Sequence, residues 1–368
     1  MFDRHAVTTG PNDARDLSER LVWWLQNEER QNFGDYLSKL LCDHLASGIR
    51  VHGDVYRLIG STISDWMIHD DLSRLGKWDR GRIVFWGCGA RDETPLRPES
   101  LERSVFCGVR GPLTRAVMNL PDSTPLGDPA LLTPMLYQPR QSARTKGKAV
   151  CVPHFYEKSS DARILEATGA DAVVRPSIAK SPEALKQILD DIGSAGFVLA
   201  GSLHAAIVAC AYGTPFCYFD GGVVDLPFKW RDFSASVNIG TFFASNVAEG
   251  QAAYESLIRP RLRKPLLFPI LAAAPFRVQS AQFLKTALHD AERLGARDPI
   301  DVGAFSTFVE FADRDIAAIA AESHRLTLAA AEESLKEERL AHADAHRRLT
   351  DLTGKYDALS EALSDRAA

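Results

Sequence analysis

The sequence lacks several features that would assign it to a specialised class of protein. Its six cysteines are scattered, and no two of them form a C-x-x-C pair. Most lie in apolar runs, where a free thiol behaves as a small buried hydrophobe. We therefore expect reduced cysteines and no metal site. The formal net charge of -5 is small for 368 residues, whereas a general nucleic-acid binder normally shows a strongly basic face.

Long apolar runs are also missing. The first residues, MFDRHAVTTGPNDARD, lack the apolar core of a secretory signal, and no uninterrupted stretch approaches the roughly 20 apolar residues that cross a bilayer. The closest run, residues 266–276, is interrupted by two prolines and has basic flanks. It suits either contact with an anionic membrane surface or internal packing. We expect a cytoplasmic protein, peripheral to the inner face of the membrane if the first alternative holds.

Length and patterning predict a parallel α/β architecture with two domains. The chain exceeds what one hydrophobic core usually organises, and 45% of its residues are hydrophobic. Short apolar runs end in glycine or polar turns and lead into helices, which is typical of parallel sheets. The expected strands are residues 21–25, 56–59, 82–86, 105–107, 149–152, 172–174, 197–200 and 216–219. One expected helix follows the loop at residues 32–35, and another begins near residue 161. The other expected helices cover residues 114–119, 182–192 and 205–212.

A polar, basic stretch at residues 137–148 reads as the connection between two Rossmann-like domains. We place these domains at residues 1–138 and 139–260, with a cleft between them. A helical or apolar connecting region follows at residues 261–310.

Residues 311–368 form the last predicted segment, a long helix. From Phe311 onward there is no proline and one glycine. Leu349, Leu352, Tyr356 and Leu359 recur at spacings of three and four, which predicts a coiled-coil seam and a homo-oligomer. The alternative is a single helix lying on the body. The Asp313-Arg314-Asp315 triplet within it is interpreted as a solvated helix face.

The most specific motif is CGVRGPLTRAVMNLPDSTPLGDPALLTP, which begins at Cys107. Glycines bracket Arg110 at a strand-to-helix turn, where the backbone can approach a bound anion closely. The Arg110 guanidinium would offer a planar donor fork to a carboxylate or phosphate. The alternative is an ion pair with a nearby carboxylate. Asp128, which precedes Pro129, is interpreted as a turn or cap residue.

A second motif, AGSLHAAI from Ala200, lies where an apolar strand gives way to a helix. Ligands collect at such positions in an open α/β sheet. His204 can exchange a proton near neutral pH, and Ser202 could bind a phosphate or carboxylate oxygen. The alternative for His204 is a structural histidine at a helix start.

Four separated motifs together resemble the polysaccharide pyruvyl transferase family over roughly residues 20 to 240. They are the early N-F-G-D, the central G-V-R-G-P-L-T-R with L-G-D-P, the late S-L-H followed by A-Y-G-T-P, and the segment KWRDFSAS from Lys229. The last is similar to the F-K-x-x-D-Y-Y-S-S segment of the exopolysaccharide branch. Ser202 stands where the family often has arginine, and Ala205, Phe233 and Ala235 also depart from its usual residues.

This resemblance implies a glycosyltransferase-B-like fold, phosphoenolpyruvate as donor, and a sugar or lipid-linked saccharide as acceptor. It gives Arg110 the donor-binding role and His204 the essential histidine role. Lys229 is a further candidate for the donor phosphate or carboxylate. Ser202 stands where the family often has arginine, so if the donor carboxylate needs such a cation, Lys229 or Arg91 must supply it.

The resemblance leads to a hypothesis for the chemistry, with two rivals. His204 would act as the acid, Arg110 and Lys229 as the anion clamp, and Asp35 would orient or deprotonate the acceptor hydroxyl, although the N-F-G-D loop would equally suit a helix N-cap. Neither a metal nor a cofactor is expected. The rivals are a nucleotide-sugar glycosyltransferase on the same scaffold and a non-catalytic coiled-coil assembly protein.

Overall fold

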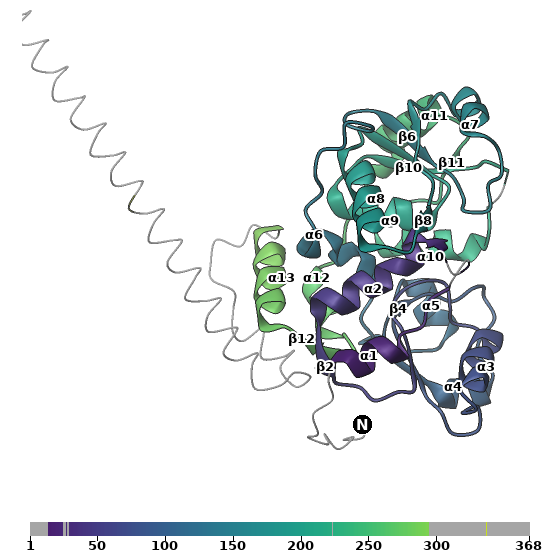
Figure 1. Ribbon diagram of the computed structural model, residues 1–368, viewed down its shortest axis with the longest axis vertical. Coiled ribbons are helices and arrows are strands. Elements are labelled where there is room, and N and C mark those ends of the chain that lie inside the picture. The colour runs from purple at the N-terminus through teal and green to yellow at the C-terminus, as the bar shows by residue number, and fades with distance from the viewer. Residues whose placement is uncertain (1–13, 25–26, 28, 223, 294–335, 337–368) are drawn as a thin grey trace, which may run out of the picture. The chain divides into compact units, whose positions relative to one another are not determined.

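The computed structural model describes residues 14–24, 27, 29–222, 224–293 and 336 (Figure 1). The chain divides into two compact units, Met1–Asp290 and Ala291–Ala368. Nearly all described residues belong to the first unit. Apart from Lys336, the predicted C-terminal helix with its coiled-coil seam and its Asp313–Asp315 triplet lies outside the described residues.

The first sheet of this unit has three parallel strands in the order β3-β4-β5. They are β3 (Val55–Arg57), β4 (Ile83–Cys88) and β5 (Ser104–Val109). Every residue of β4 is buried, because a central parallel strand is covered on both faces, and this is why it reads as an unbroken apolar run. Three helices link or follow the strands, namely α3 (Asp65–Arg74), α4 (Pro98–Arg103) and α5 (Pro112–Val117).

The second sheet has five parallel strands in the order β11-β10-β9-β6-β7, with helices packed around it (Figure 1). The strands are β6 (Ala149–Val152), β7 (Ala172–Val173), β9 (Phe197–Ala200), β10 (Phe216–Phe219) and β11 (Phe243–Ala244). The helices are α7 (Asp161–Thr168), α8 (Pro182–Ser194), α9 (Leu203–Tyr212), α10 (Pro227–Ser236) and α11 (Val247–Ala253). The chain runs from β6 to β7 on one side and returns to β9 on the other. The topological switch point therefore lies between β6 and β9, where ligands bind in open α/β sheets.

Two antiparallel pairs tie distant parts of the chain together. Strand β1 (Arg30–Asn32) pairs with β8 (Ser177–Ala179), so the N-terminal segment reaches the half built on the second sheet. Strand β12 (Phe276–Val278) pairs with β2 (Ala46–Ile49), so the C-terminal segment returns to the first half. The remaining helices are α1 (Ala14–Arg20), α2 (Phe33–Leu45), the 3₁₀ helix η1 (Pro129–Leu132), α6 (Thr133–Leu136), the π-helical turn η2 (Tyr254–Ile258), α12 (Leu267–Ala272) and α13 (Ser280–Arg293).

The predicted parallel α/β class is confirmed, and one predicted strand is wrong. Of the predicted strand at residues 21–25, the structure describes residues 21–24, and these contain an isolated bridge from Leu21 to Tyr56 in place of a strand. The two tryptophans there pack against aromatic side chains elsewhere in the chain, and no sheet ladder forms: Trp23 contacts Tyr36, and Trp24 contacts Phe155. The glycosyltransferase-B-like arrangement and the domain bounds at residues 138 and 260 stay predictions.

The apolar run at residues 266–276 packs internally. Leu267, Phe268, Ile270 and Leu271 are buried in helix α12, and the Trp86 Nε1 donates a hydrogen bond to the Ile270 carbonyl at 2.8 Å. These side chains therefore belong to the core, as the internal-packing alternative predicts, and contact of the basic flanks with a membrane surface stays a prediction. No helix of the described residues is both long enough and apolar enough to cross a membrane.

Candidate functional site

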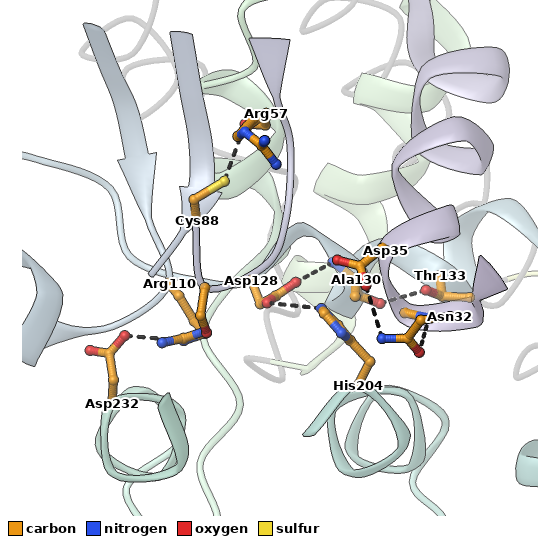
Figure 2. A network of polar contacts seen from close by, with 12 residues as sticks. Asn32, Asp35, Arg57, Cys88, Arg110, Asp128, Ala130, Thr133, His204 and Asp232 are labelled. Atoms are coloured by element: carbon orange, nitrogen blue, oxygen red, sulfur yellow. Dashed lines mark hydrogen bonds and ion pairs between the residues drawn. The ribbon is translucent and has the colours of Figure 1, made fainter. Parts of the chain in front are cut away.

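Arg110, at the carboxyl end of strand β5, is a buried arginine that joins the two halves of the unit. Its side chain is 1% exposed, and its Nε donates to the Asp232 Oδ2 of helix α10 at 3.1 Å. Figure 2 shows the two side chains pointing toward one another. Asp232 also accepts hydrogen bonds from the Thr114 backbone nitrogen at 2.9 Å and hydroxyl at 2.7 Å. The ion-pair alternative for Arg110 is therefore correct, but it accounts for only one edge of the guanidinium.

The other edge of the guanidinium keeps a donor available. Arg110 Nη1 donates to the Ser61 hydroxyl at 2.7 Å, whereas the buried Nη2 has no hydrogen-bond partner among the described residues. A Cβ at Gly89 would lie 2.0 Å from this Nη2, so only glycine leaves room for the guanidinium. Because buried polar groups are normally satisfied by hydrogen bonds, a guanidinium nitrogen without a partner favours an anionic ligand.

A second pair of buried groups, Asp128 and His204, lies close by. His204 is in the first turn of α9, and its Nε2 lies 3.9 Å from the Asp128 Oδ2. Asp128 Oδ1 accepts from the Ala130 nitrogen at 2.9 Å and so caps the 3₁₀ helix, as the sequence predicts. The Asp128 Oδ2 and the His204 Nε2 have no hydrogen-bond partner among the described residues. Figure 2 shows the imidazole pointing toward the carboxylate.

Burial shifts the protonation of both members of this pair, in opposite senses. It raises the pKa of Asp128 to about 6, because an apolar environment disfavours the carboxylate. Burial, followed by the charges of Lys229 and Arg110, lowers the pKa of His204 to about 3. His204 is therefore neutral at pH 7 in the ligand-free protein. The expectation that it acts as an acid requires a second group from which it receives a proton.

Helix α2 packs its first turn directly against the imidazole. A Cβ at Gly34 would lie 2.3 Å from the His204 Nδ1, so the glycine of the N-F-G-D loop is needed for this contact. The Asn32 Oδ1 caps the helix by accepting from the Gly34 nitrogen at 3.3 Å. The Asn32 Nδ2 donates to the Asp35 Oδ2 at 2.9 Å. The N-cap alternative is thus correct for Asn32. Asp35 does not cap the helix; it is a partly buried carboxyl whose pKa is raised to about 6 by burial.

The structure brings two further candidate residues to the same region. Lys229 Nζ pairs with the Asp225 Oδ1 at 2.5 Å, and its pKa is lowered by burial in spite of that partner. Its charge acts on His204 and on Asp35, so Lys229 contributes to the electrostatics of the site while it is paired. Ser202 immediately precedes α9 and makes no side-chain capping bond.

Arg91 lies beside this group of residues. Its guanidinium sits 5.4 Å from the ring centre of Trp66 and donates to the Ser61 carbonyl at 3.5 Å. Arg91 therefore shares Ser61 with Arg110. Among the described residues, no three His, Cys, Asp or Glu side chains gather as a metal site would require.

Gly34 allows a test of how tightly the imidazole is held. We expect Gly34→Ala to lower kcat by about 10²-fold, because a displacement of a catalytic group by about 1 Å has effects of that size. Lys39→Ala, on the partly exposed face of the same helix, is the control and should keep its activity. Steady-state kinetics together with circular dichroism spectra would separate the loss of activity from a loss of fold. An active Gly34→Ala enzyme would show that His204 does not need this position.

Comparison with known proteins shows a family match over the middle of the chain. Residues 53–222, which contain Arg110, Asp128 and His204, match the family described as polysaccharide pyruvyl transferase. This part of the chain is thus similar to polysaccharide pyruvyl transferases. The chain is 31% identical over 210 residues to the succinoglycan biosynthesis protein ExoV of Rhizobium meliloti (strain 1021), an alignment that covers 56% of this chain and 62% of that relative. No solved structure matches the chain significantly.

Three members of the site are not among the residues expected to bind or react. Asp232 lies in the KWRDFSAS motif, but no role was assigned to it, and Ser61 lies in none of the four motifs. Their roles come from contacts with Arg110 across 122 and 49 positions of the chain. Asp128 was interpreted as a cap, and the cap is real. The local turn explains the hydrogen bond of the first carboxylate oxygen. It does not reveal that the second oxygen faces His204 of the other half.

Proposed function

We propose that the protein transfers the pyruvyl group of phosphoenolpyruvate onto a pair of sugar hydroxyls, forming a ketal during exopolysaccharide biosynthesis. The observation that carries this proposal is the buried, partnerless Arg110 Nη2, whose charge reaches the His204–Asp128 pair. The family match of residues 53–222 supports the reaction class. The relative's printed role in succinoglycan biosynthesis supports the process.

The charges of the site suit a small ligand with several negative charges. Phosphoenolpyruvate carries a carboxylate and a phosphate, which guanidinium groups and helix N-termini bind well. Arg110 Nη2 would bind one of them, and the N-terminus of α9, with Ser202, would bind the other. Lys229 adds a second positive charge that acts on His204. Arg91 would complete the clamp through its link to Ser61.

The reaction needs one proton delivered to carbon and two hydroxyl protons removed. Protonation of the methylene carbon makes the adjacent carbon electrophilic, and a sugar hydroxyl attacks it. The bond between this carbon and the bridging oxygen of the phosphate then breaks, and inorganic phosphate leaves. A second sugar hydroxyl attacks the same carbon and closes the ketal ring. Asp35, with its raised pKa, is the candidate that orients or deprotonates the attacking hydroxyl.

The Asp128–His204 pair would supply the first proton. A bound dianion offsets the positive charges of Arg110 and Lys229 that disfavour the imidazolium, so the pKa of His204 should rise when the donor binds. Asp128, whose carboxyl holds a proton more readily than usual, lies 3.9 Å away and can share that proton. His204 thus becomes an acid only when the donor is in place.

The pH dependence of kcat/KM for the donor tests this proton pathway. A raised Asp128 pKa means that the free enzyme holds this proton below about pH 6 and loses it above. We expect kcat/KM to fall up to tenfold per pH unit above about pH 6. The donor phosphate titrates in the same range, so the pH profile of Asp128→Asn is measured alongside. This profile should lose the fall caused by Asp128 and keep the part caused by the donor phosphate. Identical profiles for the two proteins would rule out Asp128 as the source of the proton.

The direct test of the function is incubation with phosphoenolpyruvate and galactose- or glucose-containing saccharides. The release of phosphate and a product mass increased by a pyruvyl ketal are expected together. A product that gains a hexose from a nucleotide sugar would support the rival glycosyltransferase instead. An inert protein under all of these conditions would support the assembly role.

A further inference from the structure

Three aromatic side chains lie in contact where strand β6 ends. The rings of Phe155 and Tyr156 are 3.8 Å apart between centroids, and Trp24 of the N-terminal segment lies 4.9 Å from Phe155. Tyr156 is 59% exposed, one of the most exposed large apolar side chains among the described residues. We call Trp24, Phe155 and Tyr156 the aromatic platform.

The aromatic platform stands at the topological switch point of the second sheet. Phe155 and Tyr156 follow β6, and the Ser202–His204 segment follows the neighbouring strand β9. The two loops are in direct contact, since the Gly201 nitrogen donates to the Val152 carbonyl at 2.7 Å and a Cβ at Gly201 would lie 2.9 Å from the His154 nitrogen. The crevice position that open α/β sheets use for ligands is therefore bordered by the platform on one side.

A continuous set of polar contacts leads from the aromatic platform to the proposed donor site. The ring of buried His154 lies 5.3 Å from that of Tyr156, and its Nε2 lies 3.2 Å from the Asp225 Oδ1. The same carboxylate oxygen binds Lys229 at 2.5 Å. Burial would raise the pKa of Asp225, but His154 and Lys229 outweigh it and lower that pKa to about 2. Asp225 is thus a permanent hydrogen-bond acceptor between the platform and the donor site.

We propose that the aromatic platform binds a sugar ring of the saccharide acceptor and so places its hydroxyls beside the donor. This inference rests on the proposed function and names a binding surface for its second substrate. A pyranose ring has an apolar face made of C–H groups and a rim of hydroxyls. An aromatic ring covers the face, and polar groups at its border bind the rim.

The composition of the surroundings favours a sugar over other flat ligands. An aromatic stack for a nucleic-acid base would be lined with cations that follow the phosphate backbone. Here the nearby Asp225 is paired with Lys229. The nearby Arg175 is paired with Asp161, and the formal net charge of the chain is -5. A neutral polyhydroxylated ring meets no charge repulsion at this position.

Saturation-transfer NMR with methyl β-galactoside and cellobiose, without phosphoenolpyruvate, tests the aromatic platform by itself. The sugar C–H protons should receive saturation from the wild-type protein and from Tyr156→Phe, which keeps the ring. Tyr156→Ala should reduce that transfer severalfold. Leu101→Ala, which removes another exposed apolar side chain, should leave it unchanged. Equal transfer to sugars by Tyr156→Ala and wild type would overturn the proposal, and so would an absence of transfer from wild type.

Kinetics provide the second readout and keep the two proposals separate. Tyr156→Ala should raise the acceptor KM about tenfold, the size expected for loss of one aromatic contact, and leave the phosphoenolpyruvate KM unchanged. Unaltered acceptor KM with continued ketal formation would refute the platform and retain the proposed function. Sugar binding that depends on Tyr156 without any ketal formation would retain the platform and refute the reaction. Because Tyr156 is largely exposed, its replacement should not impair folding.

Discussion

Replacing His204 by glutamine should lower kcat for pyruvyl transfer by roughly 10³-fold, within the range that general acid–base residues contribute. The glutamine side chain approximates the volume of the imidazole but cannot carry the proton that the Asp128–His204 pair would deliver. Its amide can still face Asp128, so the packing of α9 against η1 should persist. Binding of phosphoenolpyruvate, measured by calorimetry, should weaken far less than kcat falls.

His52→Gln is the matched control for this experiment. His52 is exposed and lies outside the site, so its replacement should leave kcat and both KM values unchanged. In cells, His204→Gln should remove pyruvyl ketals from the surface polysaccharide. If the polysaccharide were unchanged in the His204 variant but altered by deletion of residues 320–368, the non-catalytic assembly role would be favoured over the enzyme.

The second large effect concerns stability and the Arg110–Asp232 pair. We expect Asp232→Ala to lower the free energy of unfolding by about 3–5 kcal/mol, because it leaves a buried guanidinium without its carboxylate. The Thr114 nitrogen and hydroxyl lose their acceptor in the same variant. Urea unfolding followed by circular dichroism would measure the change. A loss below 1 kcal/mol would mean that the ion pair does not hold the two halves together.

A double variant separates the cost of an unpaired charge from the loss of the pair. Arg110→Met combined with Asp232→Leu removes both charges, and the part of the loss that comes from the unpaired guanidinium should return, whereas Thr114 still lacks its acceptor. The stable double variant should nevertheless fail to bind phosphoenolpyruvate. Asp43→Ala breaks the exposed Lys39–Asp43 pair instead, and exposed pairs contribute little, so its unfolding curve should match that of wild type.

The sequence predicts the elements of the second sheet closely. Strands β6, β9 and β10 coincide with their apolar runs, because parallel strands buried on both faces are continuous apolar segments bounded by turns. Residues 21–25 show where that rule fails. A run with two adjacent tryptophans is apolar enough for a strand, yet Trp24 stacks on Phe155, 131 positions away, and no local pattern reveals such a contact.

The candidate site shows the same division between local and distant information. Arg110 and His204 are marked by glycine turns and helix starts in their own segments, and the resemblance of four motifs to the family selects them as candidates. The Asp232 that pairs with Arg110 depends on contacts between the two halves. The neutrality of His204 depends on burial and on two cations from other elements. Burial and long-range charge are properties of the folded chain, which is why the sequence predicts an acid where the ligand-free structure has a neutral imidazole.

A crystal structure of the protein with bound phosphoenolpyruvate tests the central claim most directly. Our account expects one donor molecule between the halves, with an anionic oxygen within hydrogen-bond distance of the Arg110 Nη2 and with the His204 Nε2 facing its methylene carbon. Donor density on another surface, touching neither side chain, would contradict it.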